Sequence, residues 1–305
     1  MGRKTHPRIQ SLKGLLIASV LRLLGWLPLP LGHGLARVLG RLLWWIPNPM
    51  RRVTRINLAL CFPHCCPHRR ARLGRRALQE TLKSAVDMAH AWHRPEQMVA
   101  RIHPGRGEHE ALRKTLERGQ PVLLLAPHLG FWEGVNLWFG CHHELHALYM
   151  PSPLPAVDQL IRNGREHFDS SLYPATPRGV ARLVRSLRGG GRIAGILPDQ
   201  VPERNAGRFV PFFGRPAATM TLAGRLAQQS GARAFMVYAR RIPGRREFEL
   251  VLRDPDPPFM DADPKRSLEG LNASIEALIM EAPEQYLWSY RRFRRRPEGE
   301  PNPYR

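Results

Sequence analysis

Short apolar runs alternate with amphipathic stretches through the middle of the chain. The apolar runs predict buried strands, because each is too short for a core helix and is bounded by turn-forming residues. The stretches between them carry apolar residues at helical spacing. The candidate strands cover residues 122–126, 144–150, 192–197, 234–239 and 248–252. This alternation predicts an α/β fold with a mainly parallel central sheet covered by helices.

The N-terminal part shows a different pattern, rich in leucine, glycine and tryptophan. Pro28 and Pro30 divide it into two helical pieces, residues 12–27 and 31–45. Basic residues interrupt both pieces, so neither contains the run of about 20 apolar residues that a membrane span requires. Long basic side chains and tryptophan rings suit the membrane interface. We predict a helical membrane-attachment segment that spans the membrane or lies in its interface; the alternative is a core helix pair of a soluble protein.

The chain of 305 residues is long enough for one large α/β domain with a helical extension. We expect residues 1–50 to form the membrane-attachment helices, 51–297 the α/β domain and 298–305 a tail. Residues 51–94, in which arginines lie between recurring apolar positions, are predicted to be helical.

The formal net charge is +22, and most of the positive charge is arginine. Such a charge favours an acidic partner, which could be nucleic acid, anionic lipid or an acidic protein. The four cysteines do not form a disulfide framework in a chain of this length. The segment CFPHCCPH at residues 61–68 matches no zinc spacing, so we interpret it as a proline-rich turn and expect no metal.

The main candidate for chemistry follows the predicted strand at 122–126. His128 lies at the carboxyl end of this strand, where open α/β sheets bind their ligands. Glu133 lies five residues on, and within one helix the two side chains would diverge by about 140°. A strand–turn–helix arrangement lets them meet, so we predict that Glu133 accepts from one imidazole nitrogen and leaves the other free as a base. The alternative is a structural histidine followed by a capping glutamate.

Asp199 and Gln200 directly follow the candidate strand at 192–197. If that strand is parallel to the strand at 122–126, Asp199 opens onto the same edge of the sheet as His128.

The segment HLGFWE at residues 128–133 resembles the His-x4-Glu signature of the lysophospholipid acyltransferase superfamily. It more closely resembles the His-Leu-Gly-Asn-Trp-Glu form of the bacterial lipid A late acyltransferases, with Phe131 in place of the asparagine. Further segments that resemble this family are INLALCFP (56–63), LPDQ (197–200), PFFGRPA (211–217) and PEQYLWSYRRF (283–293). The resemblance covers nearly the whole chain.

The resemblance adds candidate substrate-binding residues. Phe212 and Phe213 resemble a wall of the family's acyl pocket, although aromatic pairs also fill cores. Asp158 and Arg165 share a helical face. The segment around them departs from the family pattern in two places. It lacks an arginine and an asparagine before Asp158, and it has a histidine in place of an arginine after Arg165. Arg165 is a candidate for binding a phosphate or polarising a thioester oxygen; an exposed helix arginine is the alternative.

Aromatic residues and arginines interleave between residues 286 and 296. This pattern suits an anionic membrane surface, and it also occurs in nucleic-acid-binding proteins.

The resemblance implies transfer of a fatty acyl group from acyl carrier protein to a hydroxyl of a lipid A precursor. His128 would be the general base and Glu133 its orienting carboxylate, together with the binding residues Asp158, Arg165, Asp199, Gln200, Phe212 and Phe213. The expected partners are an acidic carrier protein, a glycolipid acceptor and the anionic cytoplasmic face of the inner membrane, with no nucleic acid. No cofactor is expected, and the chain lacks the Gly-x-Ser-x-Gly elbow of serine hydrolases.

Three alternatives remain open from the sequence. An acyltransferase could act on another hydroxyl-bearing membrane lipid. A thioesterase or lipid hydrolase could use the same two residues on water. A basic nucleic-acid-binding protein would account for the charge but not for the HLGFWE and LPDQ segments.

Overall fold

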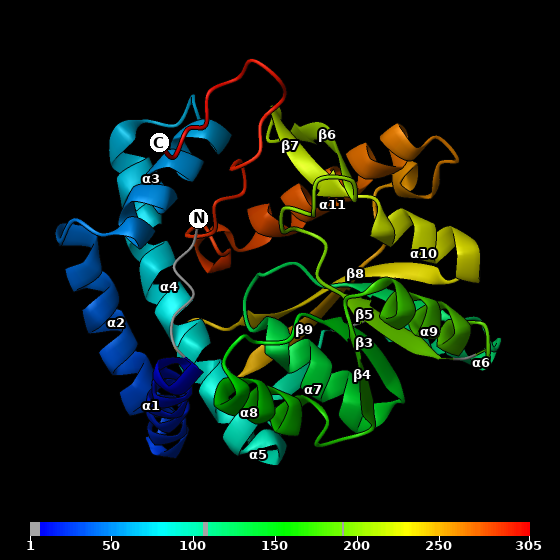
Figure 1. Ribbon diagram of the computed structural model, residues 1–305, viewed down its shortest axis with the longest axis horizontal. Coiled ribbons are helices and arrows are strands. Elements are labelled where there is room, and N and C mark those ends of the chain that lie inside the picture. Colours follow the sequence, from blue (N-terminus) through cyan, green and yellow to red (C-terminus); the bar gives the residue numbers. More distant parts are fainter. Residues whose placement is uncertain (1–6, 106–108, 191) are drawn as a thin grey trace.

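The central element of the computed structural model is a seven-stranded sheet, and the structure describes residues 7–105, 109–190 and 192–305. The strands lie in the order β1 (Ile102–Pro104), β9 (Phe248–Arg253), β8 (Arg233–Arg241), β2 (Val122–Leu125), β5 (Ile193–Ile196), β3 (Leu145–Tyr149) and β4 (Ser170–Pro174). Every neighbouring pair is parallel except β8 and β9, which are antiparallel. The predicted mainly parallel α/β sheet is confirmed (Figure 1).

All the predicted strands are present as β2, β3, β5, β8 and β9. The sheet also contains β1 and β4, which the sequence pattern did not indicate, because each of these edge strands has a single buried residue and so lacks an apolar run. A separate antiparallel hairpin of β6 (Gly207–Phe212) and β7 (Arg215–Met220) was also missed.

Helices cover both faces of the sheet (Figure 1). On one face, the core contains apolar residues of α6 (His109–Glu117) and α7 (Trp132–His142), and the neighbouring helices α5 (Pro95–Val99) and α8 (Pro155–Arg165) lie on the same side. On the other face it contains residues of α9 (Pro177–Leu187), α10 (Leu222–Ser230) and α11 (Pro264–Glu281). The side chains of β2 alternate between these two cores, and all four are fully buried.

The N-terminal part forms α1 (Pro7–Trp26), α2 (Leu29–Trp45), α3 (Pro49–Cys61) and α4 (Pro67–His93). The predicted division of the first segment near Pro28 is confirmed, whereas the single helical stretch expected over 51–94 is interrupted between α3 and α4. Proline lies in the first turn of α2, α3 and α4, where its missing N–H costs nothing. Helix α2 packs closely on α4 at Gly40. A Cβ added at Gly40 would lie only 2.6 Å from the Cα of Gln79.

The outer sides of α1 and α2 carry large apolar side chains that are 43% to 70% exposed. We call this surface the apolar face of α1 and α2; it comprises Leu12, Leu15, Leu16, Ile17, Val20, Leu23, Trp26, Leu31, Leu35, Val38, Leu39, Leu42 and Trp45. The two helices are therefore not a buried core pair, and membrane attachment stays a prediction. Among the described residues, no helix combines the length and hydropathy of a membrane crossing.

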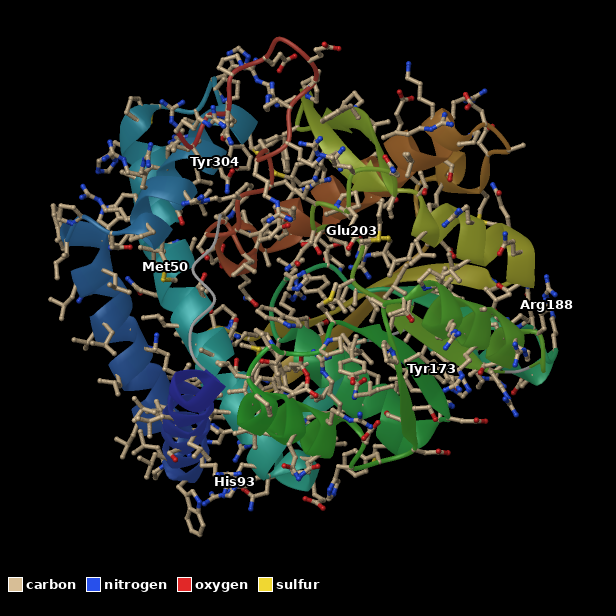
Figure 2. All side chains as sticks on the ribbon, in the orientation of Figure 1. Met50, His93, Tyr173, Arg188, Glu203 and Tyr304 are labelled. Carbon is tan, nitrogen blue, oxygen red and sulfur yellow. The ribbon has the colours of Figure 1, made fainter. Side chains whose placement is uncertain are left out.

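The C-terminal segment after α11 folds back over the domain and ends beside α3 (Figure 1). The expected membrane-binding surface is not formed by three of its aromatic side chains, because Tyr286, Trp288 and Phe293 are each 3% exposed or less. These side chains are core residues. Tyr304 lies beside α3 (Figure 2) and is also buried. Its hydroxyl donates to the side chain of Asn57 on α3. Tyr304, which lies within the residues predicted to be a tail, is thus packed against α3.

Candidate active site

His128 lies in a tight loop between β2 and α7, as the strand–turn–helix pattern predicts. The loop turns at Gly130, whose φ of 61° is in the left-handed region. A Cβ at Gly130 would lie 2.3 Å from the carbonyl oxygen of Ala239 on β8, so only glycine fits there. The N–H groups of Gly130 and Phe131 donate to Gln285 and Ala239, at 3.1 and 2.8 Å. These bonds hold the loop at the carboxyl edge of the sheet.

Asp199 holds His128 through both of its carboxylate oxygens. Oδ1 lies 2.8 Å from Nδ1 of the imidazole, and Oδ2 accepts from the backbone N–H of His128 at 3.0 Å. Nε2 of His128 lies 3.0 Å from the side-chain nitrogen of Gln200. Carboxylate and amide fit one tautomer, in which Nδ1 carries the proton and Nε2 accepts from the amide. Asp199 and Gln200 reach His128 because β5 is parallel to β2 and adjacent to it, as predicted.

The electrostatics of this contact follow from burial. Asp199 is 2% exposed, and burial alone would raise the pKa of its carboxyl group. The attraction of His128 and the hydrogen bonds from its side chain and backbone outweigh that effect, so the pKa of Asp199 lies below its ordinary value. Asp199 is therefore a permanent carboxylate at neutral pH that can stabilise a protonated imidazole.

Glu133 has different partners from those predicted. Its carboxylate accepts from Nε of Arg165 at 2.8 Å, from the same guanidinium through a second nitrogen, and from Nε1 of Trp92 at 3.2 Å. The predicted hydrogen bond from His128 to Glu133 is replaced by the one from His128 to Asp199. Burial would raise the pKa of Glu133, but the charge and hydrogen bonds of Arg165 lower it below its ordinary value, and His128 adds a weaker attraction.

Arg165 is thereby occupied within the protein, on the last turn of α8. Its side chain is 20% exposed, so it is not the solvated helix arginine that was the alternative. Asp158, on the first turn of the same helix, accepts from the backbone N–H of Ser152 at 2.7 Å. These two residues brace α8 and the loop before it against α7.

Phe212 ends β6, and Phe213 lies in the turn between β6 and β7. Phe212 is 1% exposed and lies in the core on the α11 side of the sheet, with its ring 6.2 Å from that of Phe293. Phe213 turns the β6–β7 hairpin with a φ of 47°, and its ring lies 5.2 Å from that of Phe62, which follows α3. Phe212 is a core residue and the partly buried Phe213 packs against the same core, and their role as an acyl-pocket wall stays a prediction.

Two residues near the site were missed at the sequence level. Trp92 of α4 contacts Glu133, and nothing in its sequence neighbourhood indicated this contact. Tyr286 pairs with Leu129 in an isolated bridge, and its buried hydroxyl contacts Asp199. Tyr286 belongs to the segment in which aromatic residues and arginines interleave, and that pattern indicates a membrane surface and not a contact with Asp199.

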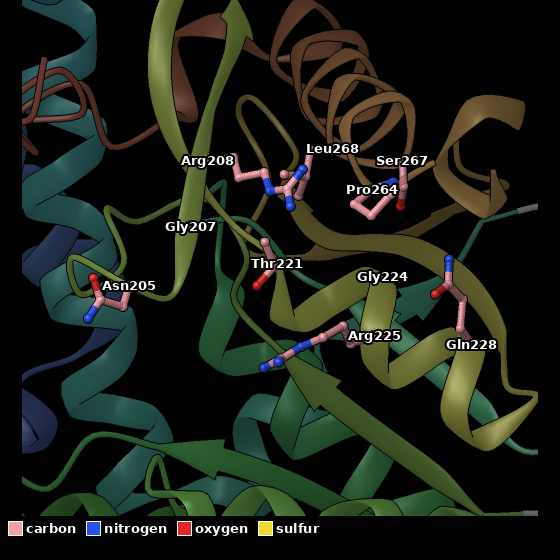
Figure 3. Close-up of a pocket in the computed structure, with 10 residues that line it drawn as sticks. All are labelled: Asn205, Gly207, Arg208, Thr221, Gly224, Arg225, Gln228, Pro264, Ser267 and Leu268. Atoms are coloured by element: carbon pink, nitrogen blue, oxygen red, sulfur yellow. The ribbon is translucent and has the colours of Figure 1, made fainter. Parts of the chain in front are cut away.

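A separate cavity of about 280 Å³ lies between the β6–β7 hairpin, α10 and α11 (Figure 3). The guanidinium groups of Arg208 and Arg225 reach it, and Thr221 and Ser267 supply hydroxyl groups. Its described lining includes none of the predicted site residues.

Comparison with known proteins identifies the family. A model of the bacterial lipid A biosynthesis acyltransferases matches residues 2–295. The chain belongs to this family. Among its curated relatives, the lipid A biosynthesis lauroyltransferase of Escherichia coli K12 is 29% identical over 94% of this chain and 92% of its own length. The myristoyltransferase of the same organism is 27% identical over 88% and 82%, and the palmitoleoyltransferase is 26% identical over 83% and 81%.

Membership of the lipid A acyltransferase family confirms the resemblance drawn from HLGFWE and LPDQ. It supports acyl transfer in lipid A biosynthesis over the nucleic-acid-binding alternative. The relatives differ in the acyl group that their names state, so the family alone leaves the acyl group of this chain open.

Proposed function

We propose that this protein transfers a fatty acyl group from an acyl carrier protein thioester to a hydroxyl group of a lipid A precursor, with His128 as the general base. The observation that carries the proposal is the imidazole of His128, held by Asp199 at Nδ1 and 15% exposed at the carboxyl edge of the sheet. Family membership supplies the reaction class.

The geometry supports a single direct transfer. Asp199 keeps the proton on Nδ1, so Nε2 is the basic nitrogen. Nε2 removes the proton from the acceptor hydroxyl as its oxygen attacks the thioester carbonyl carbon. A carbon–oxygen bond forms, the carbon–sulfur bond breaks, and the departing thiolate takes the proton back from Nε2. Asp199 stabilises the imidazolium that exists between these two proton transfers.

Gln200 has a temporary role in this mechanism. Its amide occupies Nε2 at 3.0 Å and must move away before a hydroxyl can bind there. A neutral hydrogen bond contributes only about 0.5–1.5 kcal/mol net, so an incoming hydroxyl can replace it at small cost. Gln200 thus keeps Nε2 in its accepting form until the acceptor binds.

Glu133 acts indirectly in this proposal. It neutralises Arg165 and fixes α8 against α7, and its negative charge adds to the field that favours the imidazolium. The distance-dependent attraction between Glu133 and His128 is weaker than the direct contact of Asp199. We therefore propose that Asp199 orients His128, and that Glu133 holds α7 and α8 together beside it.

We also propose that the apolar face of α1 and α2 contacts the cytoplasmic face of the inner membrane, where a glycolipid acceptor would be found. Large apolar side chains with Arg22, Arg37 and Arg41 among them suit the boundary between acyl chains and anionic headgroups. The net charge of +22 favours docking of an acidic carrier protein from the aqueous side.

The test is an assay of purified protein with acyl carrier protein thioester and lipid A precursor in mixed micelles. His128→Ala should lower turnover by about 10²–10⁴-fold, the usual contribution of a general base. His167→Ala is the matched control, because His167 is 40% exposed and pairs with Glu96 away from Asp199. Full turnover of folded His128→Ala would contradict the mechanism. Release of free fatty acid at the same rate without acceptor would instead identify a thioesterase.

A further inference from the structure

A polar cavity of about 600 Å³ lies between α2, α4 and the turn that joins β8 to β9. This volume is within the range of about 300–1,000 Å³ that is usual for ligand sites. Six of the described residues that line it are basic and two are acidic. The basic ones are Arg37, Arg76, Lys83, Arg241, Arg245 and Arg246, and the acidic ones are Glu80 and Glu284. This excess of positive charge favours an anionic ligand.

Three of these arginines are available to a ligand. Arg37, Arg76 and Arg246 are exposed, and their guanidinium groups make no hydrogen bond or ion pair with any residue that the structure describes. Glu80 does not offset their charge, because it already pairs with Arg241 at 2.7 Å. Planar guanidinium groups match the oxygens of a phosphate group, so the three free arginines suit a phosphate ligand.

The cavity borders the apolar face of α1 and α2. Its α2 residues Pro30, His33 and Arg37 are three and four residues apart, so they form one stripe along the helix. Leu31 directly follows Pro30 and Val38 directly follows Arg37, and both belong to the apolar face. One residue turns a helix by about 100°, so the cavity and the apolar face lie on adjacent sides of α2.

The cavity also adjoins the loop that carries His128. The backbone carbonyl of Gln285 accepts from the N–H of Gly130 at 3.1 Å, and the hydroxyl of Ser84 donates to the carbonyl of Gly130 at 3.1 Å. The guanidinium of Arg241 donates to Ser84 at 3.1 Å, and its backbone N–H donates to the side chain of Gln285 at 2.9 Å. Because Arg241 and Gln285 both line the cavity, its wall and the loop form one hydrogen-bonded unit.

We propose that this cavity binds the phosphate of an anionic phospholipid, and that Arg37, Arg76 and Arg246 are its ligands. The acyl chains of the same lipid lie along the apolar face of α1 and α2. This face favours a lipid over a nucleic acid, which has no hydrocarbon chains to cover it. The bound lipid fixes the orientation of the protein on the membrane, with the loop of His128 beside the surface. The inference rests on the proposed membrane contact and adds a specific headgroup site to it.

The experiment measures the partition of the purified protein onto vesicles by flotation, without thioester or acceptor. The vesicles are phosphatidylcholine alone, or phosphatidylcholine with added phosphatidylglycerol. The variant Arg37→Gln/Arg246→Gln removes two of the proposed phosphate ligands. Its partition onto phosphatidylglycerol vesicles should fall by about 10²–10⁴-fold, because each hydrogen bond between charged groups contributes about 10–100-fold. Its partition onto phosphatidylcholine alone should stay unchanged.

The variant Arg22→Gln/Arg41→Gln is the matched control. Both arginines are exposed on the same two helices, the loss of charge is the same, and neither is among the described residues that line the cavity. Partition of this control should fall by only about fivefold for each arginine, the usual contribution of a basic residue near an anionic surface.

A second measurement is native mass spectrometry of each protein released from neutral detergent with added phosphatidylglycerol. Wild type and the Arg22→Gln/Arg41→Gln control should retain one phospholipid molecule, and Arg37→Gln/Arg246→Gln should retain none.

Equal losses of partition in the two double variants would overturn the inference, because the arginines would then act only through general attraction to an anionic surface. Retention of phospholipid by Arg37→Gln/Arg246→Gln would also overturn it. Either result leaves the acyl transfer and the membrane contact standing. No binding of wild type to any vesicle would overturn the headgroup site together with the membrane contact, whereas the turnover of His128→Ala tests the acyl transfer separately.

Discussion

The buried charged cluster around Arg241 and the one around His128 differ in how many of their groups are held by charged partners. Around Arg241 of β8, Nε donates to Asp87 at 3.0 Å and the other two nitrogens donate to Glu80 and Ser84, while His33 contacts Asp87 at 2.6 Å. The side chains of Arg241 and Asp87 are 5% and 0% exposed. Every strong contact in this cluster is between charged or polar groups of α2, α4 and β8, so it joins these elements.

His128 is held on only one side by a charged group. Asp199 fixes Nδ1, whereas Nε2 contacts the neutral amide of Gln200, and the imidazole is 15% exposed. A weak, replaceable partner on an accessible nitrogen is what a general base requires. The comparison predicts that changes at Asp199 affect turnover, and that changes at Arg241 affect stability.

The largest effect is expected for Asp199→Asn. The amide cannot hold the proton on Nδ1 in the same way and cannot stabilise an imidazolium, so kcat should fall by about 10²–10⁴-fold. KM for both substrates should change little, since Asp199 contacts the imidazole and not the substrate. Steady-state kinetics and urea unfolding together check this expectation. A lower free energy of unfolding with an unchanged kcat would mean that Asp199 has a structural and not a catalytic role.

Arg241→Met should show the opposite behaviour. Removal of one partner from a buried charged cluster leaves Asp87 and Glu80 uncompensated, so the free energy of unfolding should fall by about 3–5 kcal/mol. The kcat of the folded fraction should stay close to that of wild type. Arg113→Met is the control, because the Arg113–Glu117 pair is more than half exposed and should contribute less than about 1 kcal/mol. Equal losses in the two variants, measured by urea unfolding, would contradict the comparison.

Glu133→Gln should lower the free energy of unfolding at neutral pH by about 1–3 kcal/mol, because Arg165 loses its charged partner. Acid should reduce this difference from wild type. The folded-state pKa of Glu133 lies below the ordinary 4.5, so its stabilising contribution is present above pH 4.5 and is lost as the pH falls through the lowered pKa. Unfolding measured from neutral to acid pH should converge for the two proteins. A constant difference across this range would contradict the assignment.

Gln200→Ala should have the smallest effect. If the amide only occupies Nε2 until the acceptor binds, its loss should change kcat by less than about tenfold, the equivalent of one neutral hydrogen bond. Steady-state kinetics with saturating donor check this value. A loss as large as that of Asp199→Asn would mean that Gln200 takes part in the transfer itself.

Local patterns were sufficient to predict most of the framework. The inner strands β2 and β5 are continuous apolar runs, and β8 contains one at residues 234–239. Such runs are typical of parallel strands buried on both faces. The strand end before His128 and the one before Asp199 were both recognised from these runs. The edge strands β1 and β4 were not, because each buries only one residue and therefore shows no apolar run.

The residue pattern was enough to predict that an imidazole and two carboxylates lie near one edge of a parallel sheet. Which carboxylate contacts the imidazole depends on how the strands and helices pack. The pairing of β5 with β2 brings Asp199 to His128, and the packing of α8 and α4 on α7 brings Arg165 and Trp92 to Glu133. The reason is physical: spacing along the chain limits which groups can meet, but a buried charge pairs with the neighbours that packing supplies.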